Sequence, residues 1–113
     1  MFKTLLASLL LVASTALANP LLSPDFWATA TPESLRQAVR GGADLNARDQ
    51  DGWTPLHVAA SFSQTSEVVL VLLELGADHR ARDLAGSSAW DMIQANEQLQ
   101  NTPAYRRLNG LRF

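Results

Sequence analysis

Residues 52–60 read Gly-Trp-Thr-Pro-Leu-His-Val-Ala-Ala, and this stretch decides how the rest of the chain is interpreted. Asp51 and Gly52 favour a tight turn, because glycine accepts a positive φ angle without a steric penalty. Thr54 can cap a helix with its hydroxyl oxygen, and Pro55 suits the first helical position, where no amide donor is needed. The stretch therefore predicts a turn followed by a helix that begins at Pro55.

The helix that begins at Pro55 is expected to have a shallow buried face. Leu56 and Ala59 lie three residues apart on one side of it, with Ala60 beside them. Because the two alanine side chains are small, another helix can approach closely. His57 lies three residues after the capping threonine, and we expect its ring to hydrogen-bond with that threonine and the preceding turn.

A second helix and an internal repeat are indicated further along the chain. Apolar residues at positions 68, 69, 72 and 73 form a helical stripe, and Gly76 is suited to end that helix. Residues 42–49 and 76–83 agree at six of eight positions, and 76 − 42 gives a spacing of 34 residues. Gly52 and Gly86 are also 34 residues apart, so two separate landmarks indicate one repeating unit.

Residues 54–59, Thr-Pro-Leu-His-Val-Ala, match the T-P-L-H-x-A signature of ankyrin repeats, and the chain resembles a small exported bacterial ankyrin-repeat protein. The resemblance implies an all-α solenoid of about three helix-turn-helix repeats joined by hairpin turns, with degenerate end repeats as caps. It implies an N-terminal cap at residues 19–48, a full repeat at 49–82 and a C-terminal cap at 83–113. The motif gives a structural role to Gly52, Thr54, Pro55, Leu56, His57, Ala59, Ala60 and Gly76.

The connection between the two helices of the middle repeat departs from the family pattern. Its period of 34 is one residue longer than the usual value of about 33. We place the extra residue within 63–66, where the Gly-His pair that the family normally has is missing. Either Thr65 or Ser66 is expected to cap the second helix with its hydroxyl group.

Both end repeats carry altered copies of the motif. In the first, residues 19–24 are expected to form a loop, and Thr31 and Pro32 repeat the arrangement of a capping threonine before a first-turn proline. In the last, Trp90 and Ile93 are expected to be buried, and an aspartate at position 91 replaces the histidine. Residues 96–101 are expected to be a helix end and polar loop before a final helix that carries Tyr105 and Leu108.

Residues 1–18 have the features of a cleavable secretory signal peptide. Lys3 precedes the apolar residues 5–13, and an A-x-A sequence predicts cleavage between Ala18 and Asn19. The alternative is a retained membrane anchor, but the uncharged run of residues 4–18 has 15 residues, against about 20 needed to span a bilayer. The short, simple leader predicts a bacterial protein that is periplasmic or secreted.

Charge and cysteine content narrow the classes of partner. The chain has 9 basic and 11 acidic residues, and removal of Lys3 with the leader would leave 8 − 11, or −3. This balance gives no reason to expect nucleic acid or an anionic membrane as a partner after cleavage. Because the chain has no cysteine, packing alone must hold it together. We expect a monomer on its own, and the sequence leaves self-association open.

No set of residues predicts catalysis. The sequence has no G-x-S-x-G nucleophile motif and no glycine-rich phosphate-binding loop. His57 is explained by the motif, and His79 is expected to be a solvent-exposed loop residue. Because Asp78 and Asp83 lie near His79, a small hydrolase or metal-binding protein remains a remote alternative. We therefore expect no enzyme activity, no metal and no cofactor.

The resemblance implies that another protein docks on the hairpin tips and on the inner face of each first helix. Carried over by position, the partner-binding residues are Arg48, Gln50, Asp51, Trp53, Ser61, Phe62, Leu84 and Ser87. Trp53 is either an interface anchor, since aromatic and arginine side chains dominate binding hot spots, or a residue that folds back over the neighbouring turn. The sequence leaves both open.

Two functions follow from these expectations. The first is a non-catalytic periplasmic adaptor that binds a partner protein through the hairpin tips and the concave helix face. The alternative is an immunity or inhibitor protein that neutralises a toxic or hydrolytic enzyme, since an acidic chain could cover a basic active site.

Overall fold

The computed structural model describes residues 19–111, and within that range the chain consists of helices and loops, with no strand. In chain order the elements are η1 (Pro20–Leu22), α2 (Pro24–Ala28), α3 (Pro32–Arg40), α4 (Pro55–Phe62), α5 (Ser66–Glu74), α6 (Ala89–Gln94), η2 (Glu97–Leu99) and α7 (Pro103–Leu111). The leader predicted for residues 1–18 and residues 112–113 of the expected C-terminal cap lie outside the described residues.

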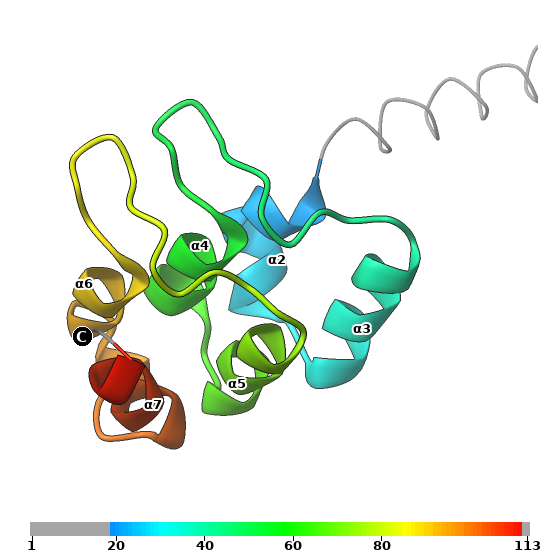
Figure 1. The fold of residues 1–113 in the computed structure, drawn as a ribbon. Helices are drawn as coiled ribbons and strands as arrows, with labels where there is room; N and C mark the ends of the chain where they lie inside the picture. The colour runs from blue at the N-terminus through cyan, green and yellow to red at the C-terminus, as the bar shows by residue number, and fades with distance from the viewer. Residues whose placement is uncertain (1–18, 112–113) are drawn as a thin grey trace, which may run out of the picture.

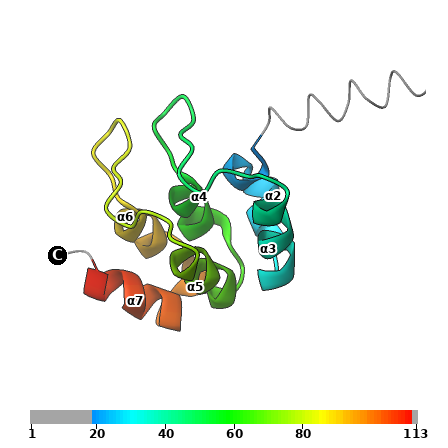
Figure 2. The same ribbon diagram turned by 45° about the vertical axis from the view of Figure 1, so that its right-hand side comes forward.

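The α-helices are arranged in two layers. Helices α2, α4 and α6 lie side by side in one layer, and α3, α5 and α7 form the other (Figures 1 and 2). Each repeat therefore contributes one helix to each layer and contacts the repeats next to it. This arrangement confirms the expected all-α solenoid of three helix pairs.

The core is centred on the middle repeat, as its sequence predicts. Leu56, Ala59 and Ala60 on α4 are fully buried, and so are Val68 and Leu72 on α5. Because α4 carries alanine where it faces its neighbours, α2 and α6 pack closely against it on either side. Truncation of a buried leucine in such a core costs about 2–5 kcal/mol.

Helices α3 and α4 begin at Pro32 and Pro55 as predicted, and the expected hydroxyl cap forms at α3 but not at α5. At α3 the Ser34 amide donates to Thr31 Oγ1 at 3.1 Å, and the Thr31 amide donates to Ser34 Oγ at 2.9 Å. At α5 Thr65 occupies the capping position without a side-chain hydrogen bond. Ser66 Oγ instead accepts the Ala104 amide of α7 at 2.9 Å, so this hydroxyl joins two helices rather than capping its own.

Two expectations for the end repeats need correction. Trp90 is half-buried, and the fully buried residues of α6 are Ala89 and Ile93. The reason is that no further helix of the described range covers the outer side of α6, so the indole rests against the Tyr105 ring at 4.9 Å between centroids. The loop expected at residues 19–24 instead contains η1, and Leu21 within it is completely buried.

Candidate partner-binding site

Two loops extend beyond the helices on the same side of the molecule. The first loop, residues 41–54, joins α3 to α4, and the second loop, residues 75–88, joins α5 to α6 (Figure 1, green and yellow). In the first loop Asp49 Oδ1 accepts the amides of Asp51 and Trp53, both at 2.9 Å. In the second loop Asp83 Oδ1 accepts the amides of residues 85 and 87 at 2.9 and 2.8 Å. The 34-residue period thus reproduces the hydrogen bonds as well as the letters.

The two loops are bonded to each other. The Leu84 amide donates to the Asp51 carbonyl at 2.9 Å. Arg48 Nη1 donates to the carbonyl of Gly52 at 3.0 Å and to that of Arg82 at 2.7 Å, so one guanidinium spans both loops. The loops therefore present one continuous surface to a partner.

Gly52 is required at this contact for two reasons. Its φ angle is +79°, a region that other residues rarely adopt. A Cβ atom built at Gly52 would lie 3.0 Å from the Leu84 backbone nitrogen, which is closer than an ordinary van der Waals contact. The turn chemistry was predicted from sequence, but the close approach of the second loop was not.

Trp53, His57 and Phe62 form an aromatic cluster at the base of the first loop. The centroid of the Trp53 ring lies 6.1 Å from that of the His57 ring and 6.4 Å from that of the Phe62 ring, and the ring planes are tilted in both pairs. Trp53 is half-buried, whereas 41% of the Phe62 surface is exposed. The indole packs back on α4 and still presents part of its surface to solvent, and its role as an interface anchor stays a prediction.

His57 holds the aromatic cluster to both loops. It is buried, its Nδ1 accepts the Thr54 amide at 3.1 Å, and Thr54 Oγ1 lies 2.8 Å from the same nitrogen. Because Nδ1 is an acceptor, the ring proton is on Nε2, which donates to the Ser87 carbonyl at 2.8 Å. The predicted bonds to the capping threonine are confirmed, and the bond to the following repeat is new. Both ring nitrogens are occupied, which argues for a structural role.

The surroundings of Asp83 favour the ionised form of its carboxylate. The hydrogen bond from the Ser87 amide is the main cause that lowers the pKa of Asp83, and the Ala85 amide and the Trp53 side chain also lower it. Partial burial opposes these effects. The charged form is therefore favoured, and it orders the second loop by accepting two amides.

The eight predicted partner-binding residues gather on or beside the two loops. Gln50, Asp51 and Leu84 are exposed at the loop tips, and 80% of the Leu84 surface is accessible. Ser61 and Phe62 lie at the end of α4, where Ser61 is half-buried. The Arg48 guanidinium and the Ser87 carbonyl are already hydrogen-bonded within the protein.

Sequence reasoning missed the role of Asn96, which lies in a stretch expected to be a polar loop. Asn96 is buried, and its amide nitrogen donates to the carbonyls of Ala60 and Ser63 at 3.1 and 3.0 Å. It thereby satisfies the C-terminal end of α4 from the next repeat. No periodic signal marks such a residue, because its partners lie more than 30 positions away.

The expectation for His79 is wrong in one respect. The residue is half-buried rather than solvent-exposed, and its Nδ1 atom is buried without a hydrogen-bond partner among the described residues.

Residues 19–111 contain no group of three or more histidine, cysteine, aspartate or glutamate side chains placed to hold a metal ion. Within the same range no helix has the length and apolar character needed to cross a membrane.

Comparison with known proteins agrees with this architecture. The family model described as ankyrin repeats (3 copies) matches residues 6–83, which is more than half of the chain. The protein phosphatase 1 regulatory subunit 27 of Mus musculus is 39% identical over 61 residues, which are 54% of this chain and 39% of that protein.

Two longer animal proteins also match part of the chain. The protein phosphatase 1 regulatory subunit 12A of Mus musculus is 35% identical over 60 residues, 53% of this chain and 6% of that protein. The ARF GTPase-activating protein Git of Drosophila melanogaster is 40% identical over 79 residues, 69% of this chain and 10% of that protein. The chain thus spans less than half the length of each of these relatives. With its repeated loops, its two helix layers and the matching family model, the chain belongs to the ankyrin-repeat family, whose members are protein–protein interaction modules.

Proposed function

We propose that this protein is an exported, non-catalytic adaptor that binds another protein through the two loop tips and the inner helix face. The observation that carries the proposal is the joined loop pair with the Trp53–Phe62 cluster at its base. A half-buried tryptophan next to an exposed phenylalanine has the aromatic composition of a binding hot spot. Rigid support from His57 and Arg48 favours that role.

The location outside the cytoplasm is part of this proposal. It depends on the sequence of residues 1–18, with their charged start, apolar stretch and A-x-A site before Asn19. The relatives named above are animal proteins, so bacterial origin also stays a prediction. N-terminal sequencing of protein recovered from culture medium or periplasm tests both the export and the cleavage position.

An inhibitory role is the second candidate. Two relatives are by name regulatory subunits of protein phosphatase 1, which supports a role in binding an enzyme without performing its reaction. A chain that carries a charge of −3 after cleavage suits a partner with a basic active site. An inhibitor blocks the captured enzyme at one-to-one stoichiometry, whereas an adaptor leaves its activity intact.

Affinity capture from extract of the exported compartment tests the adaptor proposal. We expect the wild-type protein to enrich one partner, Trp53→Ala to lose it, and the exposed-residue control Gln64→Ala to retain it. Equal capture by all three proteins would move the binding site away from the first loop. Capture of nothing by the folded wild-type protein would contradict the proposal.

A further inference from the structure

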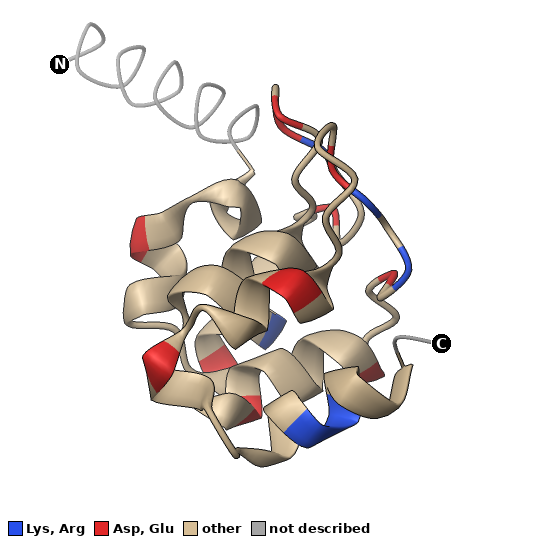
Figure 3. Cartoon of the chain, turned by 90° about the vertical axis from the view of Figure 1, so that its left-hand side faces the viewer, with Lys and Arg blue, Asp and Glu red and all other residues tan. Residues whose placement is uncertain are grey.

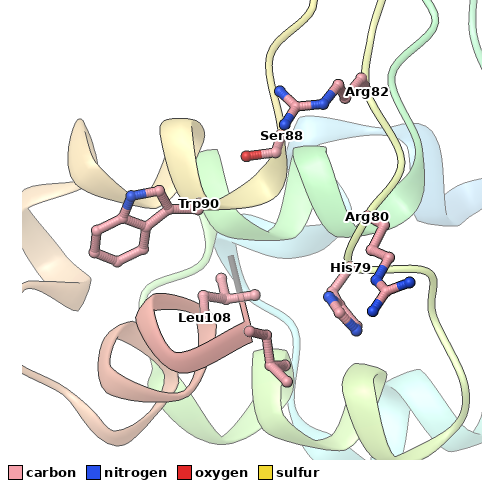
Figure 4. A pocket seen from close by; sticks show the side chains of 7 residues that line it. His79, Arg80, Arg82, Ser88, Trp90 and Leu108 are labelled. Carbon is pink, nitrogen blue, oxygen red and sulfur yellow. The ribbon is translucent and has the colours of Figure 1, made fainter. Parts of the chain in front are cut away.

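A cavity of about 280 Å³ lies at the end of the helix stack, between the second loop, α6 and α7 (Figure 4). Its basic side is formed by His79, Arg80 and Arg82 of the second loop, and its apolar side by Trp90, Leu108 and Leu111. Figure 3 looks onto this end of the molecule, with basic segments on the second loop and on α7. The cavity is separate from the Trp53 cluster, and no function described above uses it.

The internal repeat shows what fills the equivalent space one unit earlier. A shift of 34 residues relates Asn46 to Arg80 and Arg48 to Arg82. The second loop lies along the first, because the Asp78 amide donates to Asn46 Oδ1 at 3.1 Å and Arg48 donates to the Arg82 carbonyl at 2.7 Å. Ala77 and Ala81 of the second loop are buried. An extended segment of chain thus covers the edge of the first loop.

The matching edge of the second loop has no such cover within residues 19–111. Arg82 Nη1 donates to the Gly86 carbonyl at 2.8 Å, as Arg48 Nη1 donates to the Gly52 carbonyl. Arg48 also donates to the Arg82 carbonyl, but the Arg82 guanidinium has no second acceptor among the described residues. The Ala85 carbonyl, which corresponds to the paired carbonyl of Asp51, accepts no hydrogen bond from the described residues. The Arg80 guanidinium likewise has no hydrogen-bond or ion-pair partner in this range. This edge of the second loop therefore presents the hydrogen-bonding groups that the first loop uses, but no segment of the described residues binds to them.

We propose that this edge binds an extended acidic segment of a partner protein, which lies along the second loop as the second loop lies along the first. A carbonyl of the segment accepts from Arg82, and an amide of the segment donates to the Ala85 carbonyl. A carboxylate of the segment pairs with Arg80, and an adjacent apolar side chain enters the cavity beside Trp90 and Leu108. The proposal extends the adaptor function, on which it rests, to a second surface and to a defined partner chemistry.

The acidic character of the segment follows from the change of Asn46 to Arg80. Asn46 accepts an amide through its side-chain oxygen, whereas a guanidinium only donates and carries a positive charge. Asp78 and Asp83 lie nearby, but both carboxylates accept amides of their own loop. A carboxylate supplied from outside therefore gives Arg80 the charge-assisted hydrogen bonds that these two do not, and a basic segment would be repelled.

Fluorescence anisotropy with labelled eight-residue peptides tests the proposal on the whole chain. The probes alternate leucine with glutamate, with glutamine or with lysine, which keeps the length and apolar content constant. We expect the glutamate peptide to bind, and both control peptides to bind about tenfold more weakly or not at all. Arg80→Gln and Arg82→Gln should each weaken the glutamate peptide about tenfold. The exposed Arg36→Gln on α3 should leave its affinity unchanged.

Amide chemical-shift changes place the peptide and separate this proposal from the adaptor site. They should cluster in residues 79–88 and 108–111, and the Trp53→Ala variant should bind the glutamate peptide as the wild type does.

Shift changes at the first loop, equal binding of the glutamine peptide, or no binding of any peptide would overturn the inference. So would self-association abolished by Arg82→Gln, which assigns the edge to a second copy. If the glutamate peptide bound only to a variant that ends at Leu111, the cavity would be the site of residues 112–113 and not of a partner. If Trp53→Ala no longer captured the natural partner and no peptide bound to the protein, the adaptor proposal would be supported and this inference would be wrong.

Discussion

The Nε2 atom of His57 on α4 lies 2.8 Å from the backbone carbonyl oxygen of Ser87, thirty residues further along the chain. Through Nδ1 the same ring holds Thr54, the residue that precedes α4. One buried side chain therefore joins a helix start to the loop of the following repeat. Stacked repeats are stabilised by such contacts between neighbours, so the effects of losing this one should spread to both loops.

Replacement of His57 by alanine should lower the free energy of unfolding by about 2–4 kcal/mol, because it leaves the Thr54 amide and the Ser87 carbonyl without partners near the core. Urea unfolding followed by circular dichroism measures the change. The exposed Gln64→Ala on the same repeat should stay within about 0.5 kcal/mol of wild type. An equal, small loss in both variants would show that the His57 bonds contribute little.

Gly52→Ala should destabilise the protein more than Gly42→Ala. Both glycines have positive φ angles, +79° and +101°, so both alanines introduce backbone strain. Only at Gly52 does the added Cβ meet the second loop, at 3.0 Å from the Leu84 nitrogen, whereas nothing lies within 4 Å at Gly42. We expect an additional loss of about 1–2 kcal/mol at Gly52, measured as the difference between the free energies of unfolding of the two variants in urea. Equal losses would mean that the loops separate without cost.

Asn96→Ala should cost about 2–4 kcal/mol, because two buried carbonyls at the end of α4 lose their donor. Asn96→Asp should be no better, since a carboxylate cannot donate to a carbonyl. The matched control is Gln98→Ala, whose side chain is exposed and whose backbone amide still donates to Asn96 Oδ1. Hydrogen exchange of α4 amides near Phe62 reports the local effect, and protection as in wild type would contradict it.

Asp83→Asn should flatten the acid side of the stability profile. The pKa of Asp83 is lowered in the folded protein, mainly by the Ser87 amide, so ionised Asp83 favours the folded state. That contribution is fully present above the unfolded pKa of about 3.9 and is lost as the pH falls through the lower folded value. Unfolding free energies from pH 6 to pH 2 should therefore decline less steeply in the variant. Parallel profiles would show that the folded pKa is not depressed.

Much of the fold could be predicted because local chemistry decides it. The threonine before each of α3 and α4 and the proline at the first position of each helix set where those helices begin, and the two alanines of α4 allow its neighbours to approach. The half-buried state of Trp90 could not be predicted, since burial at that position depends on whether another helix follows. Asn96 and Ser66 were missed for a related reason, because their partners belong to other repeats and leave no pattern in the local sequence.

The candidate site likewise contains features that the sequence predicts and features that it does not. The turn residues around Gly52 and the bond between His57 and its capping threonine follow from spacing within one repeat. The bridge from Arg48 to the Arg82 carbonyl requires the distance between two loops, which the 34-residue period alone does not supply. Whether the exposed residues at the loop tips bind a partner remains a prediction.

The bonds that join the two loops, from Leu84 to Asp51 and from Arg48 to Arg82, also affect how a partner is recognised. Independent loops would each lose conformational entropy when a partner immobilised them, and the affinity would fall accordingly. Here that loss has already occurred during folding. Encounters should then be limited by diffusion and orientation rather than by loop rearrangement, and variants that loosen the bridge should act on the association rate.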